Sequence, residues 1–429
     1  MGRKSRLKKE RRNKKEKHLD LSFEKMETLH GVIREEDYNF IGHVNKMTID
    51  TLTGAWRDNA ENNFSSGLWD KHLNVADPGF LGMAKDKCVF GVGAGASFHL
   101  NSHVLMETLN LDGRRDWPDR RYVTIASNHQ YKPLLNMGII PDFVLAVDGS
   151  DVIYDQLCTD IPSHGQNTIF IAGVHCSHKV LKEWSEQGRE IMFYLNISDE
   201  LVKLFQKGVK GDPTRYKVEM GGNVLNGAWG LAIKRMGSRV FMGVGNDLSF
   251  KVDDDKDKQR ASYYADGDYT TNAKGTGTGR DEAGKPLTKK WGGFKLKPKL
   301  ILHSTVNKGD RYDVELDVVG TSHTLWVYKT WLESTIMRQI DNPYVGTFRY
   351  FNCSEAGILG VMSKGSQDEE LRDVSNWFLL DEKCKFYGTY MLKDAIELFE
   401  KAREMYECNR NMQGTQLIVP TAGDLVLPH

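Results

Sequence analysis

Cys88-Val89-Phe90-Gly91-Val92 runs directly into Gly93-Ala94-Gly95-Ala96-Ser97, and this junction sets the expected architecture. The first five residues are apolar without alternation, as in a strand buried on both faces of a parallel sheet. The glycines allow a sharp turn and close approach of a ligand, and a helix beginning near Ser97 would aim its free N–H groups at an anion. The spacing matches neither the dinucleotide-binding G-x-G-x-x-G motif nor a P-loop. The junction is therefore either a ligand-binding turn or simply a tight strand-to-helix turn.

Similar apolar runs recur along the chain, at 122–126, 143–147, 168–172, 191–195 and 239–244. Several stretches between them have the pattern of helices, including 179–187 and 223–236. Strands that alternate with helices indicate a mainly parallel sheet with right-handed crossovers. We therefore predict an α/β, Rossmann-like fold with helices on both faces of the sheet and helical flanks at both ends.

The chain of 429 residues carries 58 basic and 58 acidic side chains, but the charge is unevenly placed. Residues 1–18 hold ten basic and two acidic side chains, a net charge of +8 that the remainder balances with −8. This run is either a solubility tail or a contact to nucleic acid or another anionic surface. Because the rest of the chain is acidic, nucleic acid is not an expected partner outside this tail.

The sequence also predicts the cellular location of the protein. No run approaches the roughly 18 apolar residues of a membrane span, and no apolar stretch follows the basic N-terminus as in a secretory signal. The six cysteines include no C-x-x-C pair and are too sparse for a disulfide framework. We expect a cytoplasmic protein without a membrane span.

The change in pattern along the chain predicts four segments. They are a basic tail at 1–20, a helical segment at 21–86, an α/β domain at 87–365 with a polar insertion at 252–299, and a C-terminal helical segment at 366–429. The insertion is rich in Asp, Lys, Gly and Thr, so it is either a functional lid or a solvated loop.

Two strand-end aspartates and a second glycine pair point to a site. Asp148 and Asp247 each follow a predicted strand, where a carboxylate faces the crevice in which open α/β sheets bind ligands. Gly222 allows close backbone approach, and Asn223 is a predicted N-cap of the next helix. Two glycine-bounded helix starts and two aspartates at one sheet edge favour a ligand that contains phosphate.

These stretches together resemble a known family. The glycine junction, the segment Ile140-Pro141-Asp142-Phe143 through Asp148, and Gly222-Asn223-Val224 with Gly245-Asn246-Asp247-Leu248 resemble the 6-hydroxymethylpterin diphosphokinase MptE-like domain. That domain is shared with the motility-associated (Maf) flagellin glycosyltransferases and is similar in layout to bacterial sialyltransferases that use CMP-activated sugars. Tyr328 to Glu333 and Asn352 to Gly360 resemble the segment that closes the Maf-type domain, so the resemblance covers Lys87–Val361. Ala96 replaces the proline of the family's usual Gly-Pro-Ser loop.

The resemblance implies a transferase that binds a nucleotide or nucleotide-sugar donor. The donor-binding candidates are Gly93, Ala94, Gly95, Ser97, Asn128, Gly222 and Asn223. The catalytic candidates are Asp148, Asp247, His175 and Glu333, with His129 as a further candidate base. The acceptor is unknown.

Three reactions stay open. Glycosyl transfer from a CMP-sugar or another nucleotide-sugar to a hydroxyl group is favoured, because Maf-like sequence continues past Asp247. An ATP-dependent 6-hydroxymethylpterin diphosphokinase is the alternative, and it would need Mg²⁺, with Asp148 and Asp247 as ligands. The third is a nucleotide-binding protein without catalysis.

Overall fold

The computed structural model describes ten ranges of the chain. They are 54–196, 199–251, 293–296, 299–303, 311–315, 319–340, 349–354, 357–359, 387–389 and 391–413. The predicted basic tail at 1–20 and most of the polar insertion, residues 252–292, lie outside these ranges.

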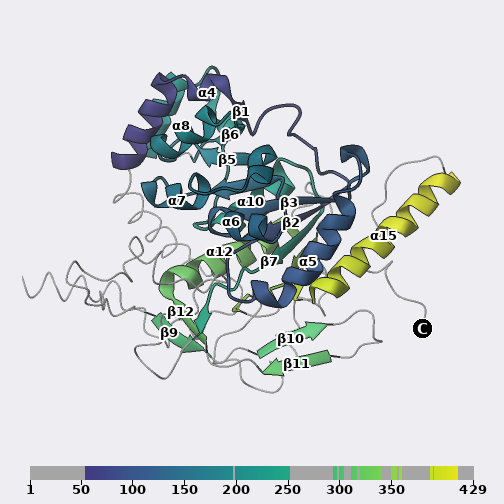
Figure 1. Cartoon of the computed structure of the whole chain (residues 1–429). Helices are drawn as coiled ribbons and strands as arrows, with labels where there is room; N and C mark the ends of the chain where they lie inside the picture. Colours follow the sequence, from purple (N-terminus) through teal and green to yellow (C-terminus); the bar gives the residue numbers. More distant parts are fainter. Residues whose placement is uncertain are drawn as a thin grey trace, which may run out of the picture.

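A nine-stranded parallel sheet forms the centre of the described structure (Figure 1). Its order is β1 (Leu73–Asn74), β6 (Ile191–Tyr194), β5 (Ile169–Gly173), β4 (Phe143–Ala146), β3 (Tyr122–Ser127), β2 (Cys88–Val92), β7 (Val240–Val244), β13 (Arg349–Asn352) and β14 (Tyr387–Thr389). Every neighbouring pair is parallel. All six predicted apolar runs are strands of this sheet, so the predicted α/β fold is confirmed.

The strand order reverses once, between β2 and β7. From β2 the chain adds β3, β4, β5 and β6 on one side, and it then returns to place β7 on the other side of β2. In open α/β sheets such a reversal leaves a crevice at the carboxyl ends of the two strands, where ligands bind. The glycine junction after β2 and the Gly245–Asp247 loop after β7 both lie at this switch point.

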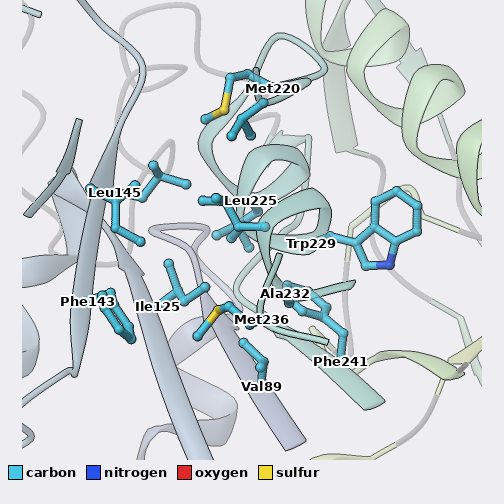
Figure 2. Packing of buried hydrophobic residues seen from close by; sticks show 14 of the residues in the cluster. Val89, Ile125, Phe143, Leu145, Met220, Leu225, Trp229, Ala232, Met236 and Phe241 are labelled. Carbon is cyan, nitrogen blue, oxygen red and sulfur yellow. The ribbon is translucent and has the colours of Figure 1, made fainter. Parts of the chain in front are cut away.

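One face of the sheet is covered by α10 (Val224–Lys234), with α12 (His323–Ile340) beyond it. Figure 2 shows Leu225 and Ala232 of α10 among Ile125 and Leu145 from the strands. Eight of the eleven residues of α10 are buried, because the helix lies between the sheet and α12. At about 1.5–3 kcal/mol for each large apolar side chain, this layer is a main source of stability.

The opposite face is covered by several helices. They are α5 (Phe98–Asp112), α6 (Asn128–Asn136), α8 (His178–Glu186) and α15 (Leu392–Gln413). Figure 1 shows α15 running alongside α5. The Tyr122 hydroxyl donates to Glu400 of α15 over 2.5 Å, which ties this helix to β3. Helices on both faces are therefore confirmed.

Shorter elements complete the described chain. The helices are α4 (Leu68–Lys71), α7 (Tyr154–Leu157) and α9 (Asp199–Gly208), with 3₁₀ turns η1 (Trp117–Asp119), η2 (Asp151–Ile153), η3 (Ser163–Asn167) and η4 (Pro213–Tyr216). A three-stranded antiparallel sheet has the order β8 (Phe250–Lys251), β12 (Val319–Ser322), β9 (Gly293–Leu296), and β10 (Lys299–His303) pairs with β11 (Arg311–Glu315). Thus β9 and the first residue of β10 fall within the predicted polar insertion. No helix in the described ranges is long and apolar enough to cross a membrane.

A helix at residues 54–65 covers the carboxyl ends of β4 and β5. The Asn63 amide donates to the carbonyl oxygens of Val174 and Cys176 over 2.7 and 3.0 Å. The Asn59 amide donates to the Gly149 carbonyl over 2.7 Å. These side chains satisfy backbone carbonyls that the strand ends would otherwise leave unpaired. The predicted helical segment 21–86 thus contains helices, and it also supplies β1 at the edge of the sheet.

We predict that Asn63→Ala lowers the free energy of unfolding by about 2–3 kcal/mol, because two buried carbonyls lose their donor. Asn62→Ala is the matched control: Asn62 is exposed on the same helix and should change stability by less than about 0.5 kcal/mol. Urea unfolding of both variants measures the difference. Equal stability of the two variants would show that the Asn63 hydrogen bonds do not stabilise the fold.

Candidate functional site

The glycine junction after β2 lies directly against the loop after β7. The Gly93 N–H donates to the Val244 carbonyl over 2.8 Å, and the Gly95 N–H donates to the Gly245 carbonyl over 2.9 Å. A Cβ at position 93 would lie 2.4 Å from the Gly245 carbonyl oxygen, so a side chain there would separate the two loops. The glycines are thus required by the approach of two backbone segments at the switch point.

Asp247 occupies the N-terminal end of α5. Its carboxylate accepts hydrogen bonds from the Ser97 N–H over 2.8 Å and from the Ser97 hydroxyl. A Cβ at position 95 would lie 2.6 Å from the Asp247 carboxyl carbon. The side chain is 5% exposed, and burial raises its pKa to about 6 although the bonds from Ser97 favour the charged form. The anion expected at this helix start is therefore matched by a carboxylate of the chain itself.

Residues 352–354 and 357–359 pack over the loop that carries Asp247. The Asn246 N–H donates to the Ser354 hydroxyl over 2.8 Å, and the Ile358 N–H donates to the Asp247 carbonyl over 2.9 Å. A Cβ at Gly357 would lie 2.4 Å from that same carbonyl oxygen. The stretch expected to close the domain thus buries the back of the switch point.

The start of α10 reaches the same place. Asn223 is the N-cap, and its side-chain oxygen accepts from the Asn226 N–H over 2.9 Å, as predicted. The Leu225 side chain would lie 3.1 Å from a Cβ at Gly93, so the first turn of α10 borders the glycine junction. The structure therefore brings together the glycine junction, the loop that carries Asp247 and the first turn of α10, which Asn223 caps.

Glycine is needed at positions 221 and 222 for a structural reason that the sequence did not reveal. Both have positive φ, at +58° and +82°. Cβ atoms at these positions would lie 2.2 Å from the Trp331 ring and 2.1 Å from the Tyr328 ring of α12. The two glycines thus allow α12 to pack closely on the turn before α10.

The ends of β3 and β4 carry two further predicted residues. Asn128 is half-buried at the start of α6, and its Nδ2 donates to Gln156 Oε1 of α7 over 2.6 Å. Gln156 Nε2 lies 3.2 Å from His129 Nδ1. Asp148 is exposed, and its Oδ1 accepts from the Ser150 N–H over 2.8 Å in a tight turn. Sequence reasoning did not identify Gln156, because nothing marks it before α7 is placed beside α6.

His175 follows β5 but is fully buried. The Trp56 ring lies 4.7 Å from the imidazole, centroid to centroid, and Nε2 donates to the Val147 carbonyl over 3.4 Å. Nδ1 has no hydrogen-bond partner within the described ranges. Burial lowers the pKa of His175 to about 4, outweighing the Val147 carbonyl and the nearby Asp148 charge. The side chain is therefore neutral near pH 7, beneath Trp56.

Glu333 is buried in an ion pair within α12. Lys329 Nζ lies 2.6 Å from Glu333 Oε2, and both side chains are less than 10% exposed. Because the Glu333 carboxylate is paired with a buried ammonium group one helical turn away, it is not available as a catalytic base. Of the four predicted catalytic side chains, only Asp148 is exposed to solvent.

Asp148 and Asp247 do not fit a shared Mg²⁺. Their strands, β4 and β7, are separated by β3 and β2, a spacing of about 14 Å at about 4.8 Å per strand. Both Asp247 oxygens are bonded to Ser97. The described residues contain no group of three or more His, Cys, Asp or Glu side chains placed to hold a metal ion.

A comparison with known protein families gives a match over this part of the chain. Residues 69–253 match the family described as 6-hydroxymethylpterin diphosphokinase MptE-like. The match includes both loops of the switch point and the start of α10. This match confirms the resemblance to the MptE-like family over residues 69–253.

Among solved structures, the chain is similar to the Maf glycosyltransferase from Magnetospirillum magneticum AMB-1. The identity is 16%, the TM-score is 0.38, and the match covers 76% of this chain and 41% of that one. The chain thus spans less than half the length of this distant neighbour. Comparison with curated proteins gives no match.

We predict that Gly95→Ala lowers the free energy of unfolding by about 1–3 kcal/mol, because the new methyl group collides with the Asp247 carboxyl group. Gly54→Ala is the control, since a Cβ at position 54 meets nothing within 4 Å. Thermal and urea unfolding compare the two variants. A Gly95→Ala protein as stable as Gly54→Ala would contradict the close contact between the two loops.

We also predict a pH dependence of stability from His175. Its pKa is lower in the folded state, about 4, than the ordinary value of 6.5, so the unfolded state takes up the proton first as the pH falls. The wild type should lose about 3 kcal/mol relative to His175→Phe between pH 6.5 and pH 4, and the difference should be constant above pH 7. Urea unfolding across this range measures it. His103→Gln, at an exposed position, should keep the wild-type slope; a wild-type slope in His175→Phe would refute the burial of a neutral imidazole.

Proposed function

We propose that the MptE-like domain binds a nucleotide-linked donor at the carboxyl edge of the sheet, around the β2–β7 switch point. We further propose that it transfers a glycosyl group from this donor to a hydroxyl acceptor. The proposal is supported by the meeting of the glycine junction, the α10 start and the ends of β3 and β4 at one edge, all within the family match. This is the place where open α/β sheets bind ligands.

The charged part of the donor belongs near α10 rather than α5. The Asp247 carboxylate already occupies the positive end of the α5 dipole and would repel a phosphate there. At α10, Gly222 is exposed and Asn223 is half-buried, so a ligand can approach this helix start. We therefore assign donor phosphate binding to the Gly222–Asn223 turn, with the glycine junction against an uncharged part of the donor.

The acceptor hydroxyl needs a base, and Asp148 is the residue that we assign to it. In glycosyl transfer the bond between the sugar and the donor phosphate breaks, the nucleotide leaves with the electron pair, and the acceptor oxygen loses its proton. His175 is covered by Trp56, Glu333 is ion-paired, and Asp247 is bonded to Ser97. The exposure of Asp148 is the observation that carries this assignment.

Diphosphoryl transfer from ATP to a hydroxymethylpterin is the second candidate, and the description of the matching family favours it. Such a reaction uses Mg²⁺ to neutralise the phosphates. The separated positions of Asp148 and Asp247 do not fit a shared ion, so we route no step through Mg²⁺ and rank glycosyl transfer first.

We predict that Asp148→Asn keeps donor affinity but lowers turnover by about 100-fold or more, because the base is lost while the turn is kept. Asn223→Ala should instead weaken nucleotide binding, since it removes the cap of α10. Asp160→Asn, at an exposed aspartate outside the site, is the control and should match the wild type. Turnover of CMP-sugars and nucleotide-induced thermal stabilisation are measured for all three variants, with and without Mg²⁺.

The two candidate reactions give different results in this assay. Metal-independent stabilisation by CMP or a CMP-sugar supports glycosyl transfer, whereas Mg²⁺-dependent release of AMP from ATP with a hydroxymethylpterin supports the diphosphokinase. A ligand well above its dissociation constant should raise stability by a few kcal/mol. Absence of stabilisation by every nucleotide would therefore contradict both.

A further inference from the structure

Gln156 of α7 forms a bridge between two neighbouring residues at the start of α6. Its Oε1 accepts from Asn128 Nδ2 over 2.6 Å, and its Nε2 lies 3.2 Å from His129 Nδ1. Asn128 is a predicted donor-binding residue, and His129 was a candidate base. One amide side chain thus contacts both residues at the carboxyl end of β3.

The chemistry of an amide fixes the direction of both hydrogen bonds. A glutamine oxygen only accepts and its nitrogen only donates. Since Oε1 accepts from Asn128, Nε2 donates to His129, and His129 Nδ1 must be unprotonated. The neutral imidazole therefore carries its proton on Nε2, and the Asn128 amide is held with one N–H toward Gln156 and Oδ1 as an acceptor.

We propose that Gln156 is a positioning residue of the donor site, which sets the tautomer of His129 and the amide orientation of Asn128. This inference rests on the proposed function, in which Asn128 binds the donor. With this tautomer, neutral His129 offers an N–H at Nε2 and is a hydrogen-bond donor there. The Asn128 oxygen accepts only from N–H or O–H groups, so Asn128 Oδ1 contacts a hydroxyl or amino group of the donor and not a phosphate oxygen.

The position of α7 makes this bridge a link between two strand ends. The chain leaves β4, passes the Asp148 turn and η2, and enters α7. Gln156 therefore joins the segment after Asp148 to the residues that follow β3. The segment that follows the base that we assign is thus tied by one side chain to the donor contact that we assign.

The fold of α7 does not depend on this bridge. Ile153 and Leu157 are buried on either side of Gln156, and Lys132 Nζ of α6 donates to the Asp155 carbonyl over 3.2 Å. A change at Gln156 should therefore alter Asn128 and His129 without unfolding the helix. Lys132→Ala provides a matched control, because it removes another bond between α6 and α7 and leaves the bridge intact.

The first test is ¹⁵N NMR of histidine-labelled full-length protein above pH 7.5, with the His129 signals assigned from His129→Gln. The wild type and Lys132→Ala should show unprotonated Nδ1 and protonated Nε2. Gln156→Glu offers only acceptors, so it should reverse the tautomer while still accepting from Asn128. Gln156→Leu should give a mixture. Protonated Nδ1 in the wild type, or an unchanged tautomer in Gln156→Leu, would overturn the proposal.

The second test is CMP binding by calorimetry, with ATP measured in parallel. Gln156→Leu should raise the dissociation constant of the bound nucleotide about tenfold, and Lys132→Ala should leave it unchanged. An unchanged constant in Gln156→Leu overturns the positioning role. If neither nucleotide binds the wild type, the proposed function fails, and the tautomer measurement still decides whether Gln156 orients His129.

Discussion

The bond between the Asp247 carboxylate and Ser97 is the interaction on which the site depends. It joins the loop after β7 to the start of α5, across the point where the strand order reverses. A buried carboxylate is costly unless hydrogen bonds compensate it, and here Ser97 supplies both a backbone and a hydroxyl donor. The glycines at 93 and 95 follow from this contact, because no side chain fits between the two loops.

This contact also determines where an external anion can bind. A helix N-terminus attracts one negative group strongly, and at α5 that group is Asp247. The glycine junction therefore differs from a phosphate-binding loop although its composition is similar. In the proposed function, phosphate recognition therefore falls to the other helix start at the edge, α10, whose cap Asn223 is partly accessible. Residues 19–429 carry a net negative charge, which fits phosphate recognition by a helix N-terminus rather than by a broad basic surface.

The sequence was sufficient for the fold class and the six central strands, but not for the edge strands β1, β13 and β14 or for the contacts of the site. Strands buried on both faces leave continuous apolar runs, so every central strand could be predicted, as could the Asn223 cap. The partner of Asp247 could not, because Ser97 lies 150 residues away and the pairing depends on β7 returning beside β2. The close packing of Gly222 against Tyr328 could not be predicted either, since a glycine pattern does not distinguish a ligand from a packed ring. The burial of His175 could not be predicted, because Trp56, which covers it, lies before the predicted domain.

The helix at 54–65, which lies outside the family match, covers one candidate catalytic residue at the edge of the sheet while another stays exposed. Its Asn59 and Asn63 bind backbone carbonyls after β4 and β5, and its Trp56 covers His175, whereas Asp148 stays exposed in the adjoining turn. Burial makes the imidazole neutral and unreachable, whereas the exposed carboxylate is accessible. The match begins at residue 69, so this helix lies outside it. Within the described structure, a segment outside the family match therefore covers one of two neighbouring candidate side chains, His175, and leaves the other, Asp148, exposed.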